Sequence, residues 1–328
     1  MTPDVIPPDD RRAFVIFNPA SGRGGGAKRV GRFLSLLEKD MPGFKHAGTS
    51  RAGEESVLAD QAMAEGFNVI VAVGGDGTWS NVADRVVVSG RKDVALGLLA
   101  SGTGNDFGRN FGMSMRSPDV AVRTLAGGVV RNVDVGRVVS KGTPVRDPGG
   151  SSDASSAQPS TGRHFLNLVG FGFDVAVIED TAGARFLRGA LLYKVTALKN
   201  LFSYEGVPLV LEGEGKTVDG EQLMLTISSS PYFGGGFLIA PDAKLDDGML
   251  HACAIGNTPP FTRLSLFNAA PKGKHVLSPH VEMREGSRFS VRFSAPPKYE
   301  VDGELWLAEG TEVIVEAVPQ ALRVIVPG

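Results

Sequence analysis

Cysteine is almost absent from this chain of 328 residues, which contains only Cys253. A single cysteine excludes both an intramolecular disulfide and a Cys-x-x-Cys metal site. An excess of basic residues is also lacking, because the chain has 34 Lys and Arg residues and 36 Asp and Glu residues. Since general nucleic-acid-binding proteins normally carry such an excess, we expect no nucleic-acid partner.

Long hydrophobic runs are missing as well. No apolar stretch approaches the ~20 residues that a helix needs to cross a bilayer. The first residues, MTPDVIPPDDRR, are acidic and rich in proline, whereas a signal peptide would be basic and then apolar. We therefore expect a cytoplasmic protein, which leaves contact with a membrane surface open.

The first third of the chain alternates between short apolar runs and segments with apolar residues at helical spacing. This alternation predicts a parallel, doubly wound sheet in residues 1–128. The expected strands are Ala13–Phe17, Phe44–Ala47, Val69–Val73 and Val94–Ala100, and the expected helices are Ala27–Asp40, Glu54–Glu65, Thr78–Val88 and Ser117–Ala126.

After Gly127 and Gly128 the pattern changes to mostly antiparallel strands, with one expected helix at Leu187–Phe202. We therefore predict a second, β-rich domain over residues 129–320. The segment Gly142–Gly162 is rich in Ser, Gly and Pro, and it has too few large apolar residues to order itself. We expect a disordered loop there. The last strand, Ala321–Val326, could return to either domain.

The segment Gly74-Gly75-Asp76-Gly77-Thr78 follows a buried strand and opens a helix. Glycines at the carboxyl end of a parallel strand let backbone N–H groups approach phosphate oxygens. Asp76 suits such a site if Mg²⁺ lies between the carboxylate and a nucleotide. The alternative is a plain turn in which Asp76 caps the helix, and short glycine patterns alone favour that alternative.

Two further loops of the same kind favour phosphate binding. NPASGRGGG (Asn18–Gly26) and SGTGNDFGRN (Ser101–Asn110) each follow an expected strand. The P-loop pattern is absent, and the Gly22-x-Gly24-x-x-Ala27 run lacks the acid expected ~20 residues later in a dinucleotide site. Hydride transfer is therefore a weak alternative.

NPASG, GGDGT and GTGNDFGR, in this order and spacing, resemble the catalytic domain of the diacylglycerol, sphingosine and ceramide kinase superfamily, above all its soluble bacterial lipid kinases. Later blocks such as PYFGGGFLIAPDAKLDDGML and YEVDGELW also match, so the resemblance covers nearly the whole chain. It implies a nucleotide-binding α/β domain like that of NAD kinases and phosphofructokinases, followed by a sandwich-like lipid domain.

The resemblance also implies an ATP site and its magnesium ion. Asp76 would act through Mg²⁺ near the transferred phosphate, and Asp106 would join that network. Two departures from the family pattern fall in this region, at Trp79-Ser80-Asn81 and at Ala100. The residues that would line the ATP site are Asn18, Pro19, Ala20, Ser21, Gly22, Thr49, Gly74, Gly75, Asp76, Gly77, Thr78, Trp79, Ser80 and Thr103.

Two further roles come from the resemblance. Glu304 would be the general base, with Asp302 beside it, although Asp-Gly alone favours a plain type I′ hairpin. Asp247 would hold a second, structural Mg²⁺ together with the backbone carbonyls of Lys244 and Met249. For that segment the residues alone also allow a polar turn.

We therefore expect an ATP- and Mg²⁺-dependent lipid kinase. Diacylglycerol leads as the acceptor, ahead of ceramide, a sphingoid base and phosphatidylglycerol. The alternatives are a NAD kinase-like enzyme and a nucleotide- or lipid-binding regulator without turnover. The enzyme would act peripherally at the inner membrane face. Ala184–Tyr204, in which apolar residues alternate with Arg and Lys, is the candidate docking helix, although its periodicity alone favours a core helix. A homodimer is a further expectation, since dimers are common in the family.

Overall fold

The computed structural model describes residues 6–19, 26–51, 53–102, 104–113, 117–145, 162–182 and 199–328. The chain forms two compact units, of which unit 1 comprises residues 1–135 and 319–328 and unit 2 comprises residues 136–318. Within the described ranges, no helix is both long enough and apolar enough to cross a membrane.

Unit 1 is built on a parallel sheet in the order β2-β1-β3-β4-β18. Its strands are β1 (Ala13–Phe17), β2 (Lys45–Gly48), β3 (Val69–Gly74), β4 (Ala95–Ala100) and the end of β18 (Glu312–Val326). Every residue of β3 and β4 is buried, as expected for the centre of a sheet with both faces covered. The predicted parallel sheet is confirmed.

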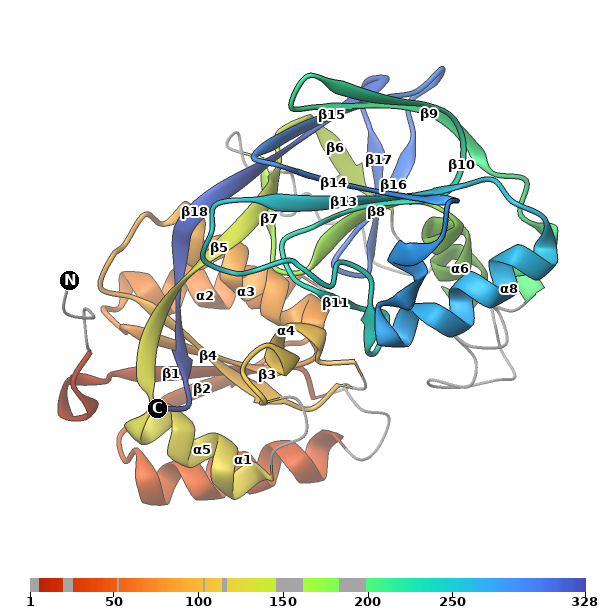
Figure 1. Ribbon diagram of the computed structural model, residues 1–328. Helices are drawn as coiled ribbons and strands as arrows, with labels where there is room; N and C mark the ends of the chain where they lie inside the picture. The colour runs from red at the N-terminus through yellow and green to blue at the C-terminus, as the bar shows by residue number, and fades with distance from the viewer. Residues whose placement is uncertain are drawn as a thin grey trace. The chain divides into compact units, whose positions relative to one another are not determined.

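Helices cover both faces of this sheet. Figure 1 shows α2 (Glu54–Ala64) and α3 (Asp76–Val88) on one face, and α1 (Gly26–Asp40) and α5 (Pro118–Gly127) on the other. The short helix α4 (Asp106–Arg109) follows β4. The doubly wound arrangement therefore follows from the alternation that the sequence shows.

Unit 2 is mostly antiparallel β structure, as predicted, around a core that includes Phe165, Phe171, Leu225, Phe289 and Trp306. Its main sheet contains the rest of β5 (Val129–Val138) and of β18, with β6 (Gly142–Pro144), β7 (Arg163–Phe165), β8 (Leu168–Gly172), β9 (Val207–Gly213), β10 (Lys216–Ser228), β13 (Leu250–Gly256), β14 (Val281–Gly286), β15 (Arg288–Arg292), β16 (Lys298–Val301) and β17 (Glu304–Ala308). A small separate ribbon pairs β11 (Tyr232–Phe233) with β12 (Phe237–Leu238).

The boundaries of the two units differ from the predicted ones. The division falls between Val135 and Gly136 rather than at residue 129, because β5 is one continuous strand that belongs to both units. Residues 319–328 belong to unit 1, where Val324 of β18 pairs with Leu96 of β4.

The prediction of a disordered loop at 142–162 is wrong for its first residues. Gly142–Pro144 forms strand β6, which pairs with β17 through the backbone, and backbone pairing does not require large apolar side chains. Residues 146–161 lie outside the described residues.

The expectation of a single helix in the second half is also wrong, because α6 (Phe173–Ala182) and α8 (Pro260–Ala269) are present. The β-branched residues of α6 favour a strand by propensity, and tertiary packing overrides that preference. Of the predicted helix Leu187–Phe202, only 199–202 is described, and 199–203 is helical. Most of the candidate docking helix therefore lies outside the described residues.

Candidate active site

The carboxyl ends of strands β1 to β4 place several predicted residues at one edge of the sheet. Asn18 follows β1, Thr49 follows β2, Gly75 follows β3 and Ser101 follows β4. Thr49 is buried, and its N–H donates to the carbonyl of Phe17 over 2.9 Å. In open α/β sheets ligands bind beyond this edge.

Two of the glycine-rich loops contact each other through their backbones. The N–H groups of Ser101 and Gly102 both donate to the carbonyl of Gly74, over 2.8 and 3.2 Å. A Cβ atom placed on Gly102 would lie 2.6 Å from the Cα of Gly75. Glycine is therefore required at this contact, because any side chain would force the loops apart.

Helix α3 begins at this contact, with Gly75, which has no side chain, as its N-cap. The backbone N–H groups of the first turn and the helix dipole favour an anion there. Asp76 is not the cap that the alternative interpretation assumed. Its Oδ1 instead accepts a hydrogen bond from the N–H of Phe107 over 3.1 Å, which links the two loops a second time.

The third loop continues into α4 and holds Asp106. Asp106 is buried, and its Oδ1 accepts a hydrogen bond from Nε of Arg109 over 2.9 Å. The preceding Asn105 has a left-handed backbone (φ 52°) and donates from its side chain to the carbonyl of Gly102. Asp106 is therefore held at the first residue of α4, next to Phe107, whose N–H donates to Asp76.

The residues that follow in α3 have mainly a packing role. Trp79 is fully buried, and its indole N–H donates to the carbonyl of Ala72 over 3.1 Å. Ser80 is also buried, while Gly77 and Thr78 remain half-buried at the start of the helix. Pro19 is exposed. Ala20, Ser21, Gly22 and Thr103 lie outside the described residues.

In unit 2, Asp302 and Gly303 form the tight turn between β16 and β17. Both have positive φ angles, 47° and 88°, as a type I′ turn requires. The buried Asp302 carboxylate accepts hydrogen bonds from the backbone N–H groups of Leu166 (2.7 Å), Asn167 (2.8 Å) and Leu168 (3.1 Å). Asp302 therefore anchors the turn to the neighbouring loop.

A second buried carboxyl group holds the other side of this turn. Oε2 of Glu300 accepts a hydrogen bond from the N–H of Gly303 over 2.6 Å. Burial raises the pKa of Glu300 well above its ordinary value, and the nearby charge of Asp174 raises it further. Asp174 is itself buried, and burial raises its pKa to about 7.

Glu304 is the first residue of β17 after the turn, and its side chain is 40% exposed. An Nη atom of the buried Arg163 lies 3.8 Å from its carboxylate. A half-exposed carboxylate on a turn that two buried acids fix is well placed to accept a proton from a bound hydroxyl group.

Unit 2 also contains an apolar pocket of about 620 Å³, open solvent at its mouth included. Arg263 and Asp174 contribute to its wall. The Arg263 guanidinium donates to the carbonyls of Thr258, Leu201 and Tyr204. The pocket therefore offers mainly hydrocarbon to a ligand. Its lining includes Phe173, Leu223, Met224, Phe233, Phe237, Ile239, Ile255, Leu266, Phe267 and Ala270.

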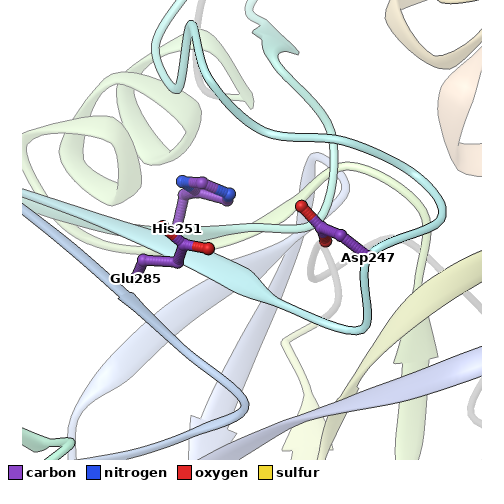
Figure 2. Close-up of side chains that lie close together, drawn as sticks. All are labelled: Asp247, His251 and Glu285. Carbon is purple, nitrogen blue, oxygen red and sulfur yellow. The ribbon is translucent and has the colours of Figure 1, made fainter.

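The structure places two further side chains beside Asp247, whose predicted partners were the backbone carbonyls of Lys244 and Met249. Asp247 lies in the turn before β13, where its Oδ1 accepts a hydrogen bond from the N–H of Met249 over 3.0 Å. Lys244 is exposed. The side chains that converge on Asp247 are those of His251 and Glu285 (Figure 2).

Several site residues were not predicted, namely Arg163, Asp174, Glu300, His251 and Glu285. Their roles depend on which strands pair and in which register, which no local motif records. Glu300 had one local signal, since it stands two residues before the Asp-Gly turn.

Comparison with known proteins covers both units. Residues 12–138 match the family described as "Diacylglycerol kinase catalytic domain". Residues 167–326 match the family described as "YegS C-terminal NAD kinase beta sandwich-like domain".

Curated relatives and solved structures agree with these matches. A diacylglycerol kinase of Bacillus subtilis (strain 168) is 27% identical over 90% of each chain. One of Mycobacterium tuberculosis (strain H37Rv) is 28% identical over 95% of this chain and 94% of its own. A crystal structure of a diacylglycerol kinase from Bacillus anthracis str. Sterne shares the fold, with a TM-score of 0.67 and 16% identity over 96% of this chain and 97% of its own. The chain is thus a lipid kinase that is similar over nearly its whole length to bacterial diacylglycerol kinases.

Proposed function

We propose that this lipid kinase transfers the γ-phosphate of ATP, bound with Mg²⁺, to the hydroxyl group of diacylglycerol. The observation that carries the proposal is Glu304, a half-exposed carboxylate on a turn held by Asp302 and Glu300. We choose diacylglycerol as the acceptor because the relatives from Bacillus subtilis and Mycobacterium tuberculosis are named diacylglycerol kinase.

The ATP phosphates would bind at the N-terminus of α3, beside the Gly75–Gly102 contact. Backbone N–H groups approach phosphate oxygens closely where glycine provides the room. Asp76 and Asp106 are the carboxylates proposed to hold Mg²⁺, the ion that neutralises charge on the transferred phosphate. The departure at Trp79 is compatible with this role, because its side chain packs in the core.

Glu304 would accept the proton of the acceptor hydroxyl as the oxygen attacks the γ-phosphorus. The bond between that phosphorus and the bridging oxygen breaks, and ADP leaves with the electron pair. Arg163 attracts the Glu304 carboxylate and would limit the orientations that it samples.

The apolar pocket of unit 2 would hold an acyl chain of the acceptor, since a pocket whose walls are mainly apolar suits hydrocarbon. Replacing Ala270 by Leu would fill part of the pocket. The variant should raise KM for long-chain diacylglycerol and leave KM for a short-chain analogue unchanged. The matched control is Asn268→Leu, an exposed position outside the pocket lining.

The assay that tests the proposal uses labelled ATP, with and without Mg²⁺, and a panel of acceptors. Diacylglycerol, ceramide, sphingosine, phosphatidylglycerol and NAD are offered separately. Labelled phosphatidic acid that forms only with Mg²⁺ would support the proposal. Preference for any other acceptor would overturn the choice of diacylglycerol, and turnover in the presence of EDTA would overturn the dependence on Mg²⁺.

A further inference from the structure

Three metal-ligating side chains converge at the start of β13. One ligand atom each from Asp247, His251 and Glu285 lies within 4.8 Å of the other two. Figure 2 shows a nitrogen of the His251 ring facing the Asp247 carboxylate. The backbone fixes this cluster, because His251 and Glu285 are directly opposite each other on the antiparallel strands β13 and β14. Opposite residues share one face of a sheet and have neighbouring Cβ atoms.

The state of His251 provides a second, independent observation. Its side chain is buried, with 6% exposed, and Nε2 has no hydrogen-bond partner within the described part of the chain. Buried polar atoms normally have a partner. An unpartnered imidazole nitrogen beside two carboxylates indicates a missing ligand that can accept its lone pair or donate to it.

Charge favours a cation at this position. Asp247 and Glu285 are both exposed, and neither forms an ion pair with a Lys or Arg among the described residues. The Met249 N–H satisfies only one Asp247 oxygen. The two carboxyl groups provide oxygen ligands and the imidazole provides a nitrogen ligand, a donor set that suits a divalent cation.

The imidazole nitrogen of His251 helps to decide which divalent ion the cluster would bind. Mg²⁺ prefers octahedral oxygen ligands and keeps several waters, whereas imidazole suits Zn²⁺ and neighbouring transition-metal ions. The Mg²⁺ site that the family resemblance implied at Asp247 uses the backbone carbonyls of Lys244 and Met249, so it shares only Asp247 with this cluster. Ligand atoms bound at ~2.1 Å to a tetrahedral ion lie about 3.4 Å apart. Small rotations of the two exposed carboxylates would bring the cluster to that spacing.

We propose that Asp247, His251 and Glu285 form a binding site for a transition-metal dication such as Zn²⁺, with an open coordination position toward solvent. Three protein ligands leave such a position, which a water molecule would occupy. The site lies wholly within unit 2 and its binding does not depend on phosphoryl transfer.

Calorimetric titration of the chelator-treated full chain tests this proposal, with ZnCl₂ and MgCl₂ in separate experiments. Zn²⁺ should bind one ion per chain and more tightly than Mg²⁺. Glu285→Gln, which changes an exposed side chain, and His251→Gln should each weaken Zn²⁺ binding by about 10-fold or more. His280→Gln, which removes an exposed histidine of the same unit, should leave the affinity unchanged.

Visible absorption of Co²⁺ bound in place of Zn²⁺ provides a readout of coordination. The absorption should be present in the wild type and in His280→Gln, and it should be lost in His251→Gln. Circular dichroism identifies any variant that has not folded, and Glu285→Gln then decides the outcome. Equal Zn²⁺ affinity in the wild type and Glu285→Gln, or tighter Mg²⁺ than Zn²⁺ binding by the wild type, would overturn the proposal.

Discussion

The backbone N–H of Phe107 donates a hydrogen bond to Oδ1 of Asp76 over 3.1 Å. This bond joins the start of α3 to the loop after β4, so Asp76 has a structural role in addition to the metal-binding role that we propose. Substitutions at Asp76 can separate the two roles, because an amide oxygen can still accept the hydrogen bond from Phe107.

Asp76→Asn should keep the stability of the wild type and lose about 10²-fold or more in kcat, since it removes the charge that would hold Mg²⁺. Asp76→Ala should lose the same activity and also about 1–3 kcal/mol of stability, because it removes the acceptor of the Phe107 N–H. Thermal melts and initial rates at saturating Mg·ATP measure both effects. Near-normal turnover by Asp76→Asn would contradict the proposed role.

Glu304→Gln should lower kcat by about 10²-fold or more, the contribution typical of one general base. ATP affinity should be little changed, because the amide retains the size of the side chain. Glu309→Gln is the matched control, at an exposed position just after β17, and should keep full activity. If Glu304→Gln weakens ATP binding and leaves kcat unchanged, Glu304 is a binding residue and not the base.

Gly102→Ala should open the contact between the two glycine loops, since the new Cβ would lie 2.6 Å from the Cα of Gly75. We expect weaker ATP binding and a loss of about 1–3 kcal/mol in stability, as for other overpacked positions. Gly31→Ala in α1 meets no atom within 4 Å and should instead add about 0.5–1 kcal/mol. Unchanged ATP affinity in Gly102→Ala would show that the loop contact does not shape the nucleotide site.

The buried carboxyl of Asp174 should make stability depend on pH. Burial raises its pKa from 3.8 to about 7, so between these values the folded chain binds a proton that the unfolded chain releases. This contribution to stability is therefore greatest in acid and falls as the pH rises toward 7. Asp174→Asn should flatten the fall in melting temperature across this range. Asp180→Asn, at an exposed position on the same helix, is the control and should keep the wild-type dependence of melting temperature on pH. An equal dependence in the wild type and both variants would exclude Asp174 as the cause.

The sequence predicted unit 1 well because its elements are marked locally. Val69–Val73 and Val94–Ala100 are unbroken apolar runs, which is typical of strands buried on both faces. The glycine motifs beside them predicted which edge carries the site. The burial of Trp79 could not be predicted, since a Trp that follows a glycine loop can face either a ligand or the core.

Unit 2 was harder to predict because its site depends on pairing between distant segments. The Asp302 carboxylate binds Leu166 and Asn167, and His251 lies opposite Glu285. Both relationships need the register of antiparallel strands, which short motifs do not contain. Hairpin chemistry did predict the turn itself, because Asp-Gly favours the positive φ angles that Asp302 and Gly303 adopt.

The position of Pro319–Gly328 in unit 1 has a consequence for the order in which the protein forms during translation. The ribosome releases β1 to β4 early, but the strand that covers the side of β4 is made only after all of unit 2. Until then the apolar strand β4 is an unpaired edge, which is the kind of surface that recruits other chains. A nascent chain halted at Val318 would therefore be an aggregation hazard, although every glycine motif of the nucleotide site had already been synthesised.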